Sequence, residues 1–341
     1  MLYNSKENWL ECVSMIKKIY VCKANGLDPY RNIATEKYLL EHVQPGACIL
    51  YLWQNQNTVV IGRNQNAWAE CRTSLLEQEG GHLARRLSGG GAVFHDLGNL
   101  NFTFLMCEED YDLDRQLSVI SEACKKAGIA VERSGRNDLL AEGQKFSGNA
   151  FYHSQGHAYH HGTLLVSADM EKLSRYLTPS KAKLESKGVS SVRSRVVNLI
   201  ELSPSLTCQL LSDYMEEAFC KVYGLEAEPY LFSQDAQEEI HKASQALCSW
   251  QWLYGQKLPF TVSLEDRFSW GSIQLQLQVT SGKIAAIQVY SDSMQWEIAE
   301  KVEANLLGLP FSVESVCNAL TGDLDPIVAA DICQLFTRTE L

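Results

Sequence analysis

Several patterns that identify common enzyme classes are missing from this chain. None of its eleven cysteines is spaced as C-x-x-C, so neither a zinc ribbon nor a thioredoxin-like redox motif is present. The serine-hydrolase pattern G-x-S-x-G and the metalloprotease pattern H-E-x-x-H do not occur either. We therefore look for the chemistry of this protein outside these classes.

The sequence also lacks an excess of positive charge and a long apolar run near its start. Its formal net charge is −11, whereas nucleic-acid binders usually carry a basic footprint. Lys6, Glu7, Glu11, Lys17 and Lys18 interrupt the first residues, so we expect no signal peptide and no membrane span. An odd number of cysteines then favours reduced thiols in the cytoplasm. An acidic surface with a local basic cluster would suit a bound anion such as a nucleotide.

Hydrophobic periodicity predicts a mixture of helices and strands. Apolar residues at helical spacing predict helices over 5–20, 31–43, 117–127, 206–223 and 235–247. Alternation of apolar and polar residues predicts strands over 100–106, which we expect to be half-buried, and over 273–279. The runs "ILYLW" and "TVVIG" predict two strands around the polar turn "QNQN", and "SQG" predicts a hairpin turn. Several hairpins favour an α+β protein over a parallel doubly wound sheet.

The length of 341 residues suggests more than one domain. The helical run 206–247 ends at "WQWLYGQKLP", beyond which strands of alternating polarity begin. We expect an N-terminal helical extension over 1–20, a large domain over 21–250 and a smaller α/β accessory domain over 256–341.

The most unusual passage is "RRLSGGGAVFHD" at 85–96. It lacks the Lys-Ser/Thr of a Walker loop, and no helical pattern follows it as in a Rossmann motif. Glycine nevertheless lets a backbone approach a ligand closely, and consecutive N–H groups can bind an anion. Arg85 and Arg86 should point to opposite faces of a strand, so we expect only one in a site. The alternative is a plain hairpin turn with two surface arginines.

A second passage, "GRNDLLAEGQKFSGNAF" at 135–151, places Lys145 among small residues. Small neighbours leave room for a ligand, and an ammonium group can bind an anion in a charge-assisted hydrogen bond. The alternative is a solvated surface lysine, as most lysines are. Four histidines between 153 and 161 invite a metal hypothesis, but His160 and His161 should point to opposite faces of a strand. The metal ligands therefore stay unknown at this point.

Together and in this order, these passages resemble the lipoate-protein ligase A family. The resemblance covers roughly residues 20 to 300 and rests on "IGRNQN", "RRLSGGGAVFHDLGNLNFTF", "GRNDL", "KFSGNAF", "HHGTLLV", "SKGVSSVRSRVVNL" and "FSWGSIQLQLQV". It implies the mixed-sheet fold of a biotin/lipoyl ligase catalytic domain followed by a small domain that moves during the cycle. It also implies two steps, in which ATP adenylates lipoate and a lysine of an acceptor domain then attacks the lipoyl-AMP.

The resemblance also implies the site residues and the partners. Lys145 matches the lysine that touches both the lipoate carboxylate and the AMP phosphate, and is the expected catalytic residue. The expected nucleotide-binding residues are Arg86, Gly91, Ala92, Val93 and Phe94, with Ser88, Asn137, Asp138, Ser147 and Gly148 as second choices. The expected cofactors are ATP and Mg²⁺, with Asp138 a candidate magnesium ligand. The expected acceptors are lipoyl domains of 2-oxoacid dehydrogenase E2 subunits and the glycine-cleavage H protein, served by a monomer.

Further expectations concern the substrate channel. The dithiolane tail of lipoate should lie in an apolar slot, lined by strands that carry leucine and phenylalanine. The basic segment 181–195 either closes over the adenylate or is an ordinary solvated loop.

Three alternative functions stay open at the level of sequence. A cysteine-dependent octanoyl or lipoyl transferase needs a thiol near Lys145, yet no cysteine lies between Cys124 and Cys208. A transferase of preformed lipoyl-AMP would use no ATP and would release no pyrophosphate. A non-catalytic binder of lipoate or nucleotide could dispense with Lys145.

Overall fold

The computed structural model describes residues 16–135, 138–178, 196–254 and 262–338. Within them an eight-stranded mixed sheet has the strand order β11-β1-β2-β6-β10-β9-β8-β7. A smaller sheet has the order β4-β3-β5, and a third has the order β12-β13-β14. The α+β class predicted from the sequence is confirmed.

The eight strands of the large sheet come from distant parts of the chain, from β1 near residue 18 to β11 near residue 229. Strands β1 and β2 pair in parallel, and β2, β6, β10 and β9 pair antiparallel. Their bounds are β1 Lys18–Lys23, β2 Ala47–Trp53, β6 Asn99–Cys107, β7 Glu132–Ser134, β8 Asp138–Ala141, β9 Gln144–Ser154, β10 His157–Leu165 and β11 Ala227–Pro229. The small sheet consists of β3 Thr58–Ile61, β4 His82–Arg85 and β5 Val93–His95.

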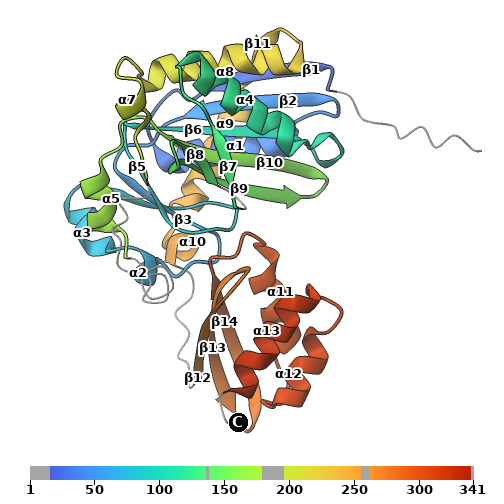
Figure 1. The fold of residues 1–341 in the computed structure, drawn as a ribbon. Coiled ribbons are helices and arrows are strands. Elements are labelled where there is room, and N and C mark those ends of the chain that lie inside the picture. The colour runs from blue at the N-terminus through green and yellow to red at the C-terminus, as the bar shows by residue number, and fades with distance from the viewer. Residues whose placement is uncertain (1–15, 136–137, 179–195, 255–261, 339–341) are drawn as a thin grey trace, which may run out of the picture.

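Helices cover both faces of the large sheet (Figure 1). Helices α4 (Leu113–Lys126) and α8 (Cys208–Tyr223) pack on one face, where they bury Phe102 and Phe104 of β6. Helix α1 (Pro29–His42) packs on the other face, with α9 (Gln234–Leu247) against it. Burial of each such phenylalanine contributes roughly 1.5–3 kcal/mol to the free energy of unfolding. The central strands are therefore a main source of the stability of this fold.

Short helices and a 3₁₀ turn connect these elements. Their bounds are α2 Ala67–Glu70, α3 Thr73–Gln78, η1 Glu108–Asp110, α5 Met170–Tyr176, α7 Leu199–Leu202 and α10 Trp250–Tyr254.

Helix ends follow the local sequence. Asp28 caps α1 by accepting from the Tyr30 and Arg31 amides, and Pro29 follows at the first helical position. Thr207 caps α8, which ends at Gly224 with φ of 67°, a left-handed conformation that glycine adopts without strain. The predicted stop of α8 at this glycine is confirmed.

The C-terminal part of the chain forms its own core. Strands β12 (Val262–Phe268), β13 (Gly271–Thr280) and β14 (Lys283–Ser291) pair antiparallel. Three helices cover one face of this sheet: α11 Glu297–Leu306, α12 Val313–Leu320 and α13 Pro326–Thr337. We propose on this basis that residues 21–250 and 256–341 are separate domains.

Two sequence predictions are wrong in detail. The N-terminal helix was expected to reach Tyr20, but Lys18–Lys23 form β1; residues 1–15 lie outside the described residues. The strand over 100–106 is buried on both faces, because helices lie on each side of β6. The two strands predicted around "QNQN" are confirmed as β2 and β3, which belong to different sheets. The hairpin turn at "SQG" is confirmed, since β9 and β10 pair across it with Gln155 and Gly156 at positive φ.

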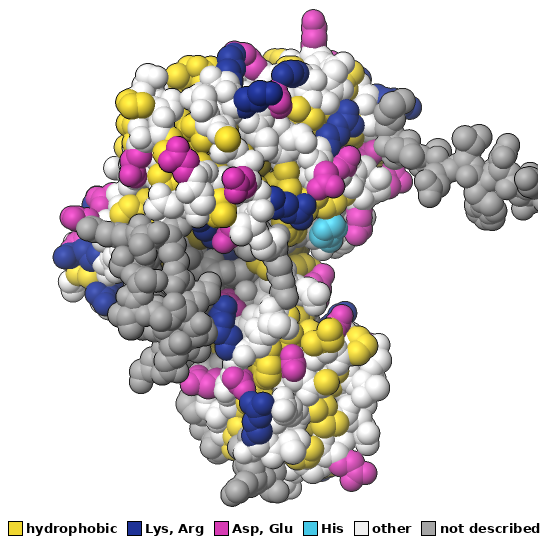
Figure 2. All heavy atoms as spheres, in the orientation of Figure 1, with side chains coloured by type: hydrophobic (Ala, Val, Ile, Leu, Met, Phe, Trp, Pro, Cys, Tyr) yellow, Lys and Arg dark blue, Asp and Glu magenta, His cyan; other side chains and the backbone are white. Residues whose placement is uncertain are grey.

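Surface charge is mixed on the face shown in Figure 2, where Lys and Arg side chains alternate with Asp and Glu. No helix among the described residues is both long and apolar enough to cross a membrane.

Candidate active site

A pocket lies between one face of the large sheet and the small sheet β4-β3-β5. Its lining residues come from β2, β3, β5, β6, β9, β10, the glycine loop before β5 and the loop after β14. They are Trp53, Val60, Arg86, Gly90, Gly91, Ala92, Val93, His95, Asn101, Lys145, Gly148, Asn149, Ala150, His161, Gly162, Thr163 and Met294.

The floor of the pocket is a row of residues that crosses four adjacent strands. Trp53 on β2 is in register with Asn101 on β6, and Asn101 is in register with Thr163 on β10. The Thr163 Oγ1 accepts from the Gly148 amide of β9 at 3.3 Å. Residues in register on neighbouring strands share a face. The row therefore runs from Gly148 on β9, at one end of the pocket, to Trp53 on β2, at its aromatic end.

Lys145 lies at the β9 end of this row. Its Nζ is 2.7 Å from the Asp138 Oδ1, and each of the two side chains is about one-third exposed. A Cβ built on Gly148 would lie 3.2 Å from the same Nζ, so the ammonium lies directly over this glycine. The absence of a side chain at position 148 therefore leaves room for the lysine at the pocket mouth.

We expect Gly148→Ala to impair binding of an anion at Lys145 without unfolding the protein. The added methyl group meets the far end of a flexible side chain rather than the backbone, so the lysine will shift by a few tenths of an ångström. The affinity of the pocket for an anion such as AMP should fall about tenfold, because a shift of this size weakens a charge-assisted hydrogen bond that contributes about 1.5–3 kcal/mol. Thermal unfolding should stay within a few degrees of the unmodified protein; a large loss of stability would show that Gly148 serves the fold instead.

The paired arginines diverge as the sequence predicts. Arg85 donates to the carbonyls of Gly62, Gln65 and Leu253, and does not line the pocket. Arg86 lines the pocket and donates to the carbonyls of Gly89 and Gly91 at 2.7 and 2.8 Å. Arg86 therefore holds the bend of the glycine loop in addition to placing a cation beside the pocket.

A buried chain of polar groups supports Arg86 from below. Its Nε donates to the Ser88 hydroxyl at 3.0 Å, and that hydroxyl is 2.8 Å from the His161 Nε2. The His161 Nδ1 is 2.7 Å from the Glu36 Oε1, which also accepts from the Thr103 hydroxyl at 2.7 Å. All five residues are less than a tenth exposed. These bonds connect Glu36 on α1 to Arg86 through His161 and Ser88, whereas the second carboxylate oxygen of Glu36 has no partner among the described residues.

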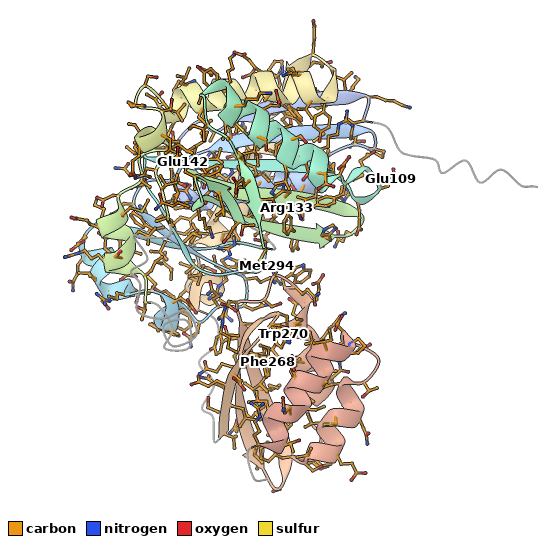
Figure 3. The ribbon with its side chains drawn as sticks, in the orientation of Figure 1. Glu109, Arg133, Glu142, Phe268, Trp270 and Met294 are labelled. Carbon is orange, nitrogen blue, oxygen red and sulfur yellow. The ribbon has the colours of Figure 1, made fainter. Side chains whose placement is uncertain are left out.

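The glycine loop contacts the C-terminal part of the chain. The Gly90 amide donates to the Ser293 carbonyl at 2.9 Å, and a Cβ on Gly89 would lie 2.1 Å from that same oxygen. Met294, labelled in Figure 3 at the junction of the two parts, lines the pocket with its Sδ against Gly90. The Ser293 carbonyl lies so close to the backbone at position 89 that only glycine fits there.

Two histidines near the site are buried in neutral form. Burial lowers the pKa of His95 to about 3, with smaller contributions from Arg86 and His161. Burial lowers the pKa of His160 to about 3 as well. His160 lies on the opposite face of β10 from His161, between Gln116 and Asn149. The two adjacent histidines therefore serve different faces of the sheet, as predicted.

These two histidines predict a loss of stability in mild acid. The unfolded chain takes up protons at both sites below the ordinary pKa of 6.5, whereas the folded chain does so only near 3. Stability is therefore complete above pH 6.5 and falls as the pH drops toward 3, by at most about 1.4 kcal/mol per pH unit for each histidine. Urea midpoints at pH 7 and pH 5 test this above the range of most carboxylates; equal midpoints would contradict it.

The structure brings most, but not all, of the predicted site residues together. Arg86, Gly91, Ala92, Val93, Lys145 and Gly148 line the pocket. Phe94 does not, because its ring packs against Tyr176 in another core cluster. Ser88 lies beneath the pocket, and Ser147 is buried outside its lining. Asp138 binds Lys145, and Asn137 lies outside the described residues.

The strands β6 and β10, which carry leucine and phenylalanine, do line the pocket, but with other side chains. The apolar walls are Trp53, Val60, Ala92, Val93, Ala150 and Met294. Leu100, Phe102, Phe104 and Leu164 of these strands point to the opposite face, into the core under α4 and α8. In "NLNFTF" of β6, Asn and Thr alternate with Leu and Phe. The Asn and Thr side chains lie on the face of the strand that is turned toward the pocket, so this alternation could have predicted that face.

Sequence reasoning missed Glu36, Trp53, Asn101 and Met294. The basic segment 181–195 lies outside the described residues. No group of three or more His, Cys, Asp or Glu suited to a metal ion occurs in the part of the chain that the structure describes. No cysteine is among the pocket residues named above.

Comparisons with known proteins agree with this geometry. Residues 28–220 match the family model "Lipoyl protein ligase A/B catalytic domain", and residues 257–335 match "Bacterial lipoate protein ligase C-terminus". Lipoate-protein ligase A of Psychrobacter cryohalolentis is 40% identical over 88% of this chain and 91% of its own length. That of Bdellovibrio bacteriovorus is 39% identical over 89% and 92%.

Solved structures show the same fold. The P. falciparum LipL1 structure in complex with lipoate has a TM-score of 0.81 at 27% identity, and covers 93% of this chain and 99% of its own. A lipoate-protein ligase A bound with ATP has a TM-score of 0.61 at 22% identity, and covers 71% of this chain and 99% of its own.

Proposed function

The chain belongs to the lipoate-protein ligase A family, and we propose from this premise that it activates free lipoate with ATP and transfers the lipoyl group to a lysine of acceptor lipoyl domains. The observation that supports this most strongly is the pocket itself. Lys145, Arg86 and the glycine loop all line it, and the remaining walls are mainly apolar and aromatic. An acid with a long apolar tail, activated by a nucleotide, fits both parts of this lining.

Adenylation is the first step. A carboxylate oxygen of lipoate attacks the α-phosphorus of ATP, the bond to the β-phosphate oxygen breaks, and pyrophosphate leaves. Both reactants are anionic and repel each other as they approach. Lys145 and Arg86 offset this repulsion most strongly in the transition state, where the negative charges are closest. The pocket walls hold the acid in position and exclude water.

Transfer is the second step. The uncharged amine of the acceptor lysine attacks the acyl carbon of lipoyl-AMP, the bond to the AMP oxygen breaks, and the amine loses a proton. We propose lipoyl domains of 2-oxoacid dehydrogenase E2 subunits and the glycine-cleavage H protein as acceptors. We further propose that the enzyme acts as a monomer in the cytoplasm.

Magnesium fits the site as a companion of ATP rather than as a resident ion. Mg²⁺ is usually held by one or two carboxylates together with substrate phosphates, and Asp138 is a carboxylate beside Lys145. We propose that Asp138 would hold such an ion, which supplies positive charge to the phosphates when it is bound. The proposed nucleotide-binding residues are Arg86, Gly91, Ala92, Val93 and Lys145, with Ser88 as the support of Arg86.

Mass spectrometry of an apo lipoyl domain incubated with this protein, lipoate and MgATP tests the function. We expect one lipoyl adduct on the acceptor and release of pyrophosphate. An adduct formed from lipoyl-AMP but never from lipoate and ATP would instead show a transferase of preformed lipoyl-AMP. Binding of lipoate without any adduct would show a non-catalytic binder.

A further inference from the structure

The aromatic end of the pocket contains an unpaired hydrogen-bonding atom. His95 lines the pocket and is 3% exposed, and its Nε2 has no hydrogen-bond partner among the described residues. Its ring lies 5.9 Å from that of Trp53, edge to face. A buried polar atom without a partner costs free energy, so its retention beside a ligand pocket calls for a reason.

The surrounding hydrogen bonds fix which ring nitrogen of His95 carries the proton. The Asn32 Nδ2 donates to the Gln54 carbonyl at 2.8 Å, which fixes the orientation of that amide. The same Nδ2 is 3.0 Å from the Asn55 Oδ1, so the Asn55 Nδ2 is the atom that faces the His95 Nδ1, at 3.2 Å. The Nδ1 therefore accepts a hydrogen bond. In the neutral ring the proton is then on Nε2, which is left as a free donor.

A second unpaired atom lies in the same end of the pocket. Asn101 is 1% exposed, and its Nδ2 has no partner among the described residues, while its Oδ1 accepts from the Asn99 Nδ2 at 2.8 Å. Asn101 is the neighbour of Trp53 across the β2–β6 pair. Two polar side chains thus interrupt walls that are otherwise apolar at this end.

The length of the pocket matches the length of the acyl chain. The ammonium of Lys145 lies over β9 at Gly148, and Asn101 lies two strands away on β6. Two strand spacings amount to about 10 Å. With C–C bonds of about 1.5 Å, an extended eight-carbon acid is roughly 9 Å long. A carboxylate held at Lys145 therefore brings the tail of the acid to Asn101 and His95.

We propose that His95 and Asn101 determine the specificity of this pocket by donating hydrogen bonds to the dithiolane sulfurs of lipoate, so that lipoate is preferred to octanoate. This inference rests on the proposed function. Sulfur is a weak acceptor, but an octanoyl tail offers none and leaves both donors unpaired in an apolar enclosure. A site built around a buried donor discriminates against a ligand that lacks the acceptor.

The test compares lipoate and octanoate in one preparation of each variant. The kcat/KM of pyrophosphate release is measured with both acids for the unmodified protein, His95→Phe and Asn101→Val. We expect the lipoate-to-octanoate ratio to fall about fivefold in each variant, as the loss of one modest hydrogen bond predicts. Because both acids meet the same enzyme sample, partial unfolding of a variant cancels in this ratio.

The matched control is His153→Phe, which makes the same replacement on β9 at a position that does not line the pocket. Its ratio should equal that of the unmodified protein. A ratio left unchanged by both His95→Phe and Asn101→Val would overturn the inference while leaving the ligase function intact. Failure of the unmodified protein to release pyrophosphate with either acid would defeat the proposed function instead.

Discussion

Replacing Lys145 with alanine should lower the kcat/KM for lipoyl-adenylate formation by about 10²–10³-fold, the usual effect of removing one preorganised charge-stabilising donor. Pyrophosphate release from ATP and lipoate measures the effect.

Asp138→Asn separates the two members of the Asp138–Lys145 pair of charges. Because Asp138 is the proposed magnesium ligand, this variant should need a higher Mg²⁺ concentration for its half-maximal rate, whereas Lys145→Ala should not. Lys125→Ala is the control, since that side chain is 77% exposed on α4, away from the pocket. Near-normal lipoylation by the Lys145→Ala protein would remove this lysine from the mechanism and favour the non-catalytic or ATP-independent alternatives.

Replacing Glu36 with alanine should lower the free energy of unfolding by about 3 kcal/mol. The carboxylate is fully buried and accepts from both the Thr103 hydroxyl and the His161 ring. Removal of one member of a buried, hydrogen-bonded set leaves its partners unpaired in a low dielectric. Urea denaturation at pH 7 measures the change.

The same helix supplies the control for Glu36. Glu41 is exposed and pairs with Lys37 one turn before it, so Glu41→Ala should change the free energy of unfolding by no more than about 0.5 kcal/mol. Glu36→Gln keeps one acceptor oxygen and should fall between the two. If Glu36→Ala proved as stable as the unmodified protein, the network beneath Arg86 would not be a support of the site.

Much of the fold could be predicted because local patterns and burial agree. The helices α1, α8 and α9 follow from apolar spacing and from their caps, and the β9–β10 hairpin follows from its turn residues. The error at β1 arose because "KIYVCK" continues an apolar spacing that fits a helix as well as a strand. Only its pairing with β2 and β11 decides between them.

The candidate site was predicted only where a residue type carries its own chemistry. Lys145, Arg86 and the glycines stand out in the sequence. Charged side chains placed next to glycines are typical of a site that binds an anion. Asn101, His95 and Glu36 gave no such signal, because a buried amide, imidazole or carboxylate acquires its role from the partners that surround it. Which side chains of the leucine- and phenylalanine-bearing strands line the pocket could not be predicted either, since both faces of a central strand are buried.

The sequence by itself determined the α+β class, most element positions, the pair of anion-binding passages and their resemblance to the lipoate-protein ligase A family. These features depend on residue type and on spacing along the chain, which a sequence displays directly. Only the tertiary structure decided that Ser293 and Met294 contact the glycine loop, and that the His95 Nε2 has no hydrogen-bond partner among the described residues. These depend on which distant strands become neighbours, and strand pairing between segments far apart in sequence leaves no local pattern.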